Sequence, residues 1–186
     1  MRFSFPRNRI VVSLCLVVLL TLGLAASASA DDVAGTSNIT GGDLTLGASD
    51  APSVSATLNG TDQTVSDNFT ISVNDFRGIG AGWNLQITST AFSDDSHSLS
   101  NSAAKITAVN VACDQGTCTN PTSAISYPLT VPADATAPTA VKLFNTALNT
   151  GMGDFTITPT FAVALPANTY AGNYSSTITL SLVTSP

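Results

Sequence analysis

The feature that most limits the fold of this chain is an alternation of apolar and polar residues with a period of two. Around the single tryptophan, Trp83, Leu85, Ile87 and Ala91 alternate with polar residues. Successive side chains of a β-strand point to opposite faces, so this period predicts a half-buried strand and does not fit a helix. Trp83 is therefore expected to open a strand. The glycines at 78, 80 and 82 let the chain turn tightly just before it.

The same alternation, separated by turn residues, recurs along the chain. It is found at residues 43–47, 53–58, 69–73, 105–112, 124–131, 155–165 and 174–182. Asn59-Gly60 is expected to form a turn, and Pro159 to place its strand at an edge or a bulge. Residues 140–148 fit a short helix or a strand. About eight to ten short strands at this spacing predict an all-β fold, a single-domain antiparallel β-sandwich with Greek-key or jelly-roll-like topology.

The first 30 residues have the layout of a secretory signal peptide. Three arginines precede an apolar run, 10–24, and the small residues Ala28-Ser29-Ala30 come just before Asp31. The apolar run is too short for a membrane-spanning helix to be the better interpretation. Residues 1–30 are therefore predicted to be removed, which leaves a secreted chain with no membrane segment.

The mature chain, residues 31–186, is predicted to be one domain, with 31–41 disordered. Its only basic residues are Arg77, Lys105 and Lys142, against 12 aspartates and no glutamate, so its formal charge is 3 − 12 = −9. Nucleic acid is excluded as a partner, because charge of the same sign repels at long range. We expect short-range recognition instead.

Two cysteines remain after the signal peptide, Cys113 and Cys118. Export to an oxidising compartment favours a disulfide between them, closing a short loop. A loop this small should stabilise the fold by about 2 kcal/mol or less. No metal is expected, since these two thiols have no further ligands near them in the sequence.

Two segments carry a resemblance to a known family. Residues 75–85, DFRGIGAGWNL, followed by Thr88 and Phe92, resemble the first signature of WxL-domain proteins, which are surface proteins of Gram-positive bacteria. Residues 165–182, LPANTYAGNYSSTITLSL, resemble the closing tyrosine-led strand that forms the second signature. The two segments stand in the expected order and span most of the mature chain.

The resemblance implies non-covalent attachment to the cell wall, with peptidoglycan as the glycan partner and other surface proteins as further candidate partners. A Trp or Tyr ring stacks on the apolar face of a sugar, while amide side chains bond its hydroxyls. The predicted ligand-binding residues are Trp83, Asn84, Gln86, Tyr170 and Tyr174. No cofactor is implied.

Each of these residues also has a structural interpretation. A lone tryptophan at a strand start is more often a core residue than a sugar platform. Tyr174 is in phase with the apolar residues of the last strand, so we expect it to point partly inward. Arg77 is expected either to pair with Asp75 or to be solvated.

Catalysis is not expected from this sequence. Its single histidine, His97, lies in a serine-rich loop with Asp94 and Asp95, and no recognised catalytic motif is present. The acidic pair matches no calcium-loop pattern, and solvation explains it equally well. The competing function is a pilin-like or coat-like subunit that assembles through strand edges, because 165–182 also resembles the closing strand of such subunits.

Overall fold

The computed structural model describes residues 34–48, 51–94 and 96–186. The predicted signal peptide, residues 1–30, lies outside the described residues. By its internal contacts the chain divides into Met1–Asn38 and Ile39–Pro186, and every strand belongs to the second unit. Residues 34–41 belong to no strand. Among the residues described, no helix is long and apolar enough to cross a membrane.

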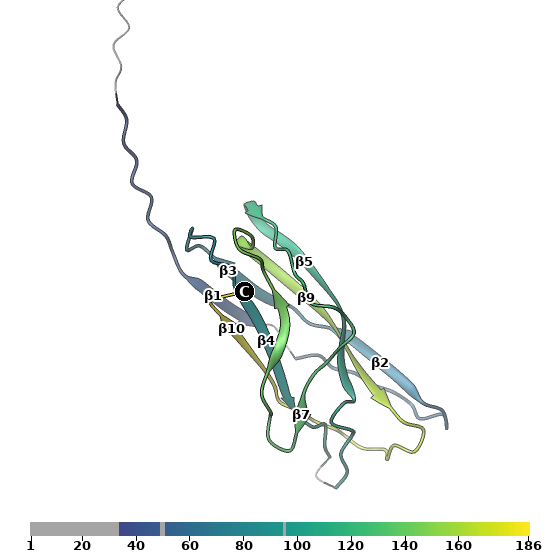
Figure 1. Cartoon of the computed structure of the whole chain (residues 1–186). Helices are drawn as coiled ribbons and strands as arrows, with labels where there is room; N and C mark the ends of the chain where they lie inside the picture. The colour runs from purple at the N-terminus through teal and green to yellow at the C-terminus, as the bar shows by residue number, and fades with distance from the viewer. Residues whose placement is uncertain (1–33, 49–50, 95) are drawn as a thin grey trace, which may run out of the picture. The chain divides into compact units, whose positions relative to one another are not determined.

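Ten strands make up the regular structure of the described residues, and they form two sheets (Figure 1). They are β1 (Leu44–Ala48), β2 (Gln63–Asn68), β3 (Ile71–Asp75), β4 (Asn84–Thr90), β5 (Ala104–Thr119), β6 (Leu129–Thr130), β7 (Ala133–Asp134), β8 (Val141–Asn145), β9 (Met152–Leu165) and β10 (Ile178–Val183). The prediction of an all-β, sandwich-like fold is confirmed.

The six-stranded sheet is built around the long strand β9. Its order is β1-β3-β9-β5-β6, and β2 pairs with β9 on the same side as β3. All of its pairings are antiparallel. Ile71 and Val73 of β3 and Phe155, Ile157 and Phe161 of β9 are buried. This alternation turns one face of the sheet into half of the core.

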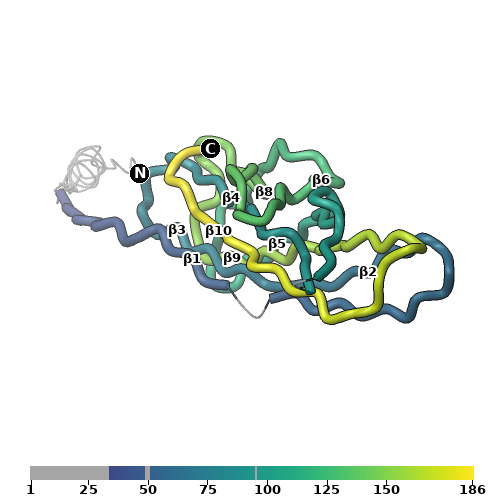
Figure 2. Tube along the Cα trace, turned by 90° about the horizontal axis from the view of Figure 1, so that it is seen from below, coloured from purple at the N-terminus to yellow at the C-terminus, as the bar shows by residue number. Residues whose placement is uncertain are grey.

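The four-stranded sheet supplies the other half of the core from β4. Antiparallel β10 and β8 flank β4, and β7 makes a short parallel pairing with it. Leu85 and Ile87 of β4 and Leu143 of β8 are fully buried. Figure 2 shows β10 running beside β4, with the connection from β9 to β10 curving past the end of β2.

Several predicted strand boundaries change in the structure. The cysteine loop is not separate from the strand before it, because β5 runs from Ala104 to Thr119 through both cysteines. The ambiguous segment 140–148 contains the strand β8 and no helix. Of the predicted strand 124–131, only Leu129–Thr130 pairs. The amide of Ala124 is instead satisfied by the side-chain oxygen of Asn145.

The predicted strand 53–58 is wrong. Val54 packs against the core, but the segment pairs with no strand. Side chains of β2 hold it instead: Ser53 N donates to Asp67 Oδ2 (2.8 Å), and Gln63 Nε2 donates to the Thr57 carbonyl (3.1 Å). The strand in this part of the chain is β2, which begins at Gln63, ten residues after the predicted start.

Pro159 lies inside the sheet, so the edge alternative of its prediction is wrong. The bulge alternative fits better, because the register of β5 with β9 shifts between Ile106 and Ala108, close to Pro159. The neighbour of β9 changes from β3 to β2 at this point, because Ile157 pairs with Ile71 and Thr160 with Asn68. The amide of Phe69, between the two strands, donates to the Pro159 carbonyl. A proline is tolerated where the ladder is already interrupted, since no partner there requires its missing N–H.

Candidate functional site

The tryptophan predicted to matter most is a core residue. Trp83 is 0% exposed and lies immediately before β4. Its indole Nε1–H donates to the Gly151 carbonyl at 2.9 Å, and its ring centroid is 5.9 Å from that of Phe144. The polar atom of the indole is therefore satisfied by protein, as is usual for a buried Trp.

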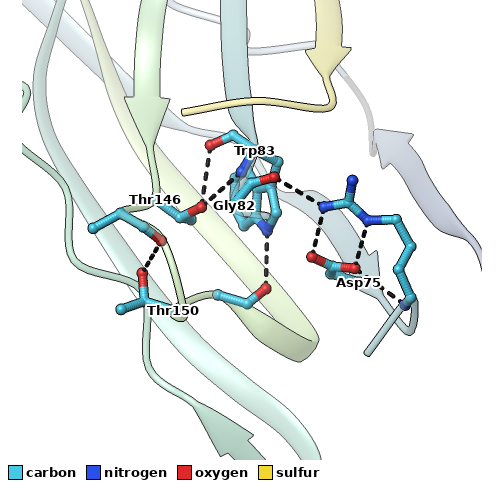
Figure 3. Close-up of polar contacts among 8 residues, drawn as sticks. Asp75, Gly82, Trp83, Thr146 and Thr150 are labelled. Carbon is cyan, nitrogen blue, oxygen red and sulfur yellow. Dashed lines mark hydrogen bonds and ion pairs between the residues drawn. The ribbon is translucent and has the colours of Figure 1, made fainter. Parts of the chain in front are cut away.

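Trp83, Phe144, Thr146 and Gly151 make up what we call the Trp83 cluster. Figure 3 shows Thr146 beside Trp83. The Thr146 hydroxyl accepts from Trp83 N (2.8 Å) and donates to Trp83 O (3.2 Å), and its own amide donates to Trp83 O (2.9 Å). The fit depends on Gly82, whose φ is +70° and whose missing Cβ would lie 3.0 Å from the Thr146 carbonyl. The closely spaced glycines before the tryptophan thus allow the approach.

An ion pair closes the glycine loop beside this cluster. Arg77 Nε and Nη2 donate to the two oxygens of Asp75, at 2.9 and 2.8 Å, and Nη2 also donates to the Gly82 carbonyl. The Asp75 side chain is 1% exposed and that of Arg77 14%. The hydrogen bond with Asp75 raises the pKa of Arg77. Of the two expectations for Arg77, pairing is the one the structure shows.

Three of the five predicted ligand residues are thereby occupied with protein contacts. Asn84 is buried and donates through Nδ2 to the Ser185 carbonyl (2.6 Å), and Gln86 Nε2 donates to Asn84 Oδ1 (2.9 Å). Stacking on a sugar needs an exposed ring face, and Trp83 has none. In this arrangement the core interpretation fits Trp83, and the sugar-platform interpretation does not.

The other two predicted residues, Tyr170 and Tyr174, lie at the opposite end of β4. They line a cavity of about 580 Å³ that we call the tyrosine groove. Its lining comes from the strandless segment 54–58, from β2 and β9, from two residues between β4 and β5, and from the loop before β10. The full set is Val54, Ser55, Ala56, Thr57, Leu58, Val65, Phe92, Leu99, Val163, Leu165, Thr169, Tyr170, Ala171, Gly172, Asn173 and Tyr174.

Tyr170 is the exposed aromatic side chain of this groove. It is 64% exposed, and its ring stacks on that of His97 with centroids 3.9 Å apart and planes 21° apart. The Tyr174 hydroxyl donates to the Tyr170 carbonyl at 3.1 Å. Tyr174 is partly buried against the core, as its phase predicts.

Asp94 organises the loop that carries His97. Its carboxylate accepts from the amides of Ser96 and His97, and it lies 3.4 Å from His97 Nδ1. The hydrogen bond from the His97 amide is the main cause that lowers the pKa of Asp94. Desolvation, followed by the nearby Asp94 charge, raises the pKa of Tyr174. The ionised Asp94 carboxylate therefore lies beside the groove, next to Gly172 of its lining.

Sequence reasoning missed the residues that support Tyr170. Asp94 and His97 belong to one loop, whereas Tyr170 lies more than seventy positions away. They meet because Ser93 pairs with Ser175 in the extension of the β4–β10 ladder. The available signal was the single histidine within an aspartate-containing loop. No group of three metal-ligating side chains occurs among the residues that the structure describes.

The fold and the groove define a β-sandwich with an aromatic-lined depression on its surface, an arrangement suited to non-covalent ligand binding. The chain matches the family model described as "WxL domain surface cell wall-binding" over residues 33–186. It therefore belongs to that family, and the family resemblance is confirmed. No curated protein and no solved structure matches the chain significantly. Membership makes this a cell-surface, cell-wall-binding domain.

Proposed function

We propose that this protein is exported and holds itself on the cell wall by binding peptidoglycan non-covalently, without performing chemistry on it. Membership in a cell-wall-binding family supports wall attachment in general. Peptidoglycan is the component with sugars and short peptides throughout the wall, and its recognition requires only short-range contacts. The chain is strongly acidic, so it repels anionic polymers at long range. This argues against an anionic wall polymer as the partner.

The observation that carries this proposal is the exposed ring of Tyr170 at the mouth of the tyrosine groove. Tyrosine is enriched at binding surfaces because its ring is apolar and its hydroxyl is polar, and ligand pockets are lined mainly by apolar and aromatic side chains. This ring also lies in the second family signature. The groove thus joins a sequence signal to an accessible surface.

Sedimentation with purified sacculi tests the proposal. The full chain is produced with its leader in a Gram-positive host, recovered folded, and mixed with sacculi stripped of proteins and attached polymers. We expect it to pellet with the sacculi, and to do so equally at high salt because screening weakens only long-range charge effects. A folded sample that stays in the supernatant, or that releases soluble wall fragments, contradicts the proposal.

Export itself has a separate readout. If residues 1–30 form a cleaved leader, N-terminal sequencing of the recovered protein should begin at Asp31. Recovery of the uncleaved chain inside the cells would contradict secretion.

Assembly through strand edges is the second candidate, and one observation favours it. Beyond Ile106, β5 pairs only with β9, so its other edge has no strand partner within the described residues. Unpaired edges of this kind can add a strand from another chain. Light scattering over a range of concentrations distinguishes the two: growing oligomers support assembly, and a constant monomer mass excludes it.

A further inference from the structure

We propose that the tyrosine groove is the site for the glycan strand of the wall, and that it binds an N-acetylated amino sugar with Tyr170 as the stacking platform. This inference rests on the proposed function and adds the site and the ligand class to it. The signature tryptophan is excluded from direct contact, since it is fully buried at the other end of β4.

The first argument is the state of the Tyr170 ring. One face stacks on His97 at 3.9 Å between centroids, yet the side chain remains 64% exposed, so the opposite face is open to solvent. The apolar C–H face of a pyranose packs on such a flat ring, as it does on Trp or Tyr elsewhere. An aromatic backed by a second ring presents this face in a fixed orientation.

The second argument is that the loop carrying Tyr170 is held in place before any ligand arrives. The Tyr174 hydroxyl bonds the Tyr170 carbonyl, and the Asp94 carboxylate fixes the His97 loop through two amides. The two loops also pack closely, because a Cβ on Gly172 would lie 2.5 Å from Asp94 Oδ2. A pre-organised site loses less conformational entropy on binding.

The third argument is the chemistry of the groove. Its floor is apolar, with Val65, Phe92, Leu99, Val163 and Leu165, and suits the methyl of an N-acetyl group. Its rim carries the hydroxyls and amides of the loop at 169–174 and of the segment at 54–58, which suit sugar hydroxyls. The volume of about 580 Å³ lies within the range of small-ligand sites, about 300–1,000 Å³.

Charge argues for the glycan over the other polymers of a wall. No lysine or arginine lines the groove, and Asp94 stands ionised beside it. A phosphate-rich polymer or the carboxylates of a stem peptide would find no cation to pair with, and would be repelled by Asp94. The glycan strand offers neutral acetamido and hydroxyl groups that match the rim.

A titration with oligosaccharides of β-linked N-acetylglucosamine tests the site on the full exported protein. Tyr170→Ala removes the platform and should weaken binding at least about tenfold. Tyr170→Phe keeps the ring and should bind within about twofold of wild type, because stacking needs no hydroxyl. Leu148→Ala is the matched control: Leu148 is 65% exposed, almost the same as Tyr170, and lies near the Trp83 cluster. It should bind normally.

The outcomes separate this inference from the proposed function. If wild-type protein sediments with sacculi but Tyr170→Ala sediments and binds the oligosaccharide equally well, the groove is not the site, and wall binding stands. If isolated stem peptides bind in the groove and the oligosaccharide does not, the ligand class is wrong. If wild-type protein does not sediment at all, the proposed function itself fails.

Discussion

At the scale of single residues, Trp83 lies in the segment that resembles the first family signature, and all of its observed polar contacts are to the protein itself. The main chain of Trp83 lies just before β4, and Thr146 supplies its partners there: the hydroxyl oxygen accepts from Trp83 N, and the hydroxyl and the amide of Thr146 both donate to Trp83 O. The indole reaches Gly151 on the same partner loop. Buried backbone groups are almost always hydrogen-bonded. The contacts of Trp83 with Thr146 and Gly151 therefore join the glycine loop to the segment after β8 and satisfy polar groups on both.

Replacing Trp83 by Phe tests that role. The ring would still pack near Phe144, but the Gly151 carbonyl would lose its donor and a small void would remain. We expect the free energy of unfolding to fall by about 2 to 4 kcal/mol, measured by chemical denaturation. The folded variant should sediment with sacculi as wild type does. Unchanged stability with lost sedimentation would instead make the tryptophan a ligand contact.

The Asp75–Arg77 pair is a second residue-scale test, because it is one of few charged pairs in a chain poor in cations. Asp75→Asn removes the charge that faces the bidentate guanidinium and leaves Arg77 largely buried without a counter-ion. We expect a loss of about 3 kcal/mol in unfolding free energy. Asp43→Asn is the control, since Asp43 is exposed and should change stability by less than about 0.5 kcal/mol. Equal effects of the two substitutions would contradict a special role for the pair.

At the scale of elements, the sequence predicts strands well where one face is buried in the core. The strands β3, β4, β9 and β10 were located because their apolar residues alternate. The strand β2 was missed because Val65 is its only apolar residue, so its period cannot be seen. Residues 53–58 have the alternation, yet β2 side chains hold them and no neighbour pairs with them. The alternation of apolar and polar residues indicates which side chains are buried. Whether a segment pairs as a strand depends on residues far away in the sequence, so the alternation alone does not predict it.

The same limit applies to the candidate site. Tyr170 could be selected from the sequence as an aromatic residue in a loop, but its support by His97 depends on the register of β4 and β10. That register brings residues 93 and 175 together, and no local pattern encodes it. Trp83 stands out in the sequence for its side chain alone. Its burial follows from contacts with Phe144, Thr146 and Gly151, and the first two of these belong to the segment 140–148, which the sequence leaves undecided between helix and strand.

The disulfide provides a prediction for one element, the end of β5. Cys113 and Cys118 are bonded, as predicted, and close a loop with a sequence separation of 5. The double substitution of both cysteines by serine should lower unfolding free energy by only about 2 kcal/mol or less, because a short loop restricts the unfolded chain little. Sedimentation with sacculi should be unchanged, since this loop is not part of the groove. Complete loss of folding would show that the bond does more than close the loop.

At the scale of the whole molecule, alkaline pH should destabilise the domain through Tyr127. Its hydroxyl donates to the Leu143 carbonyl of β8 at 2.7 Å, and desolvation by burial raises its pKa to about 12. The unfolded chain titrates near pH 10, so the unfolded state loses this proton first. The contribution is fully present below about pH 10 and is lost as the pH rises through about 12.

Denaturation series at successive pH values measure this effect. Unfolding free energy should fall between about pH 10 and pH 12 in the wild type. Tyr127→Phe should start about 1 kcal/mol lower at neutral pH, because the hydrogen bond to β8 is gone, and its decline over the alkaline range should be shallower. If Tyr127→Phe declines as steeply as wild type, another group controls alkaline unfolding.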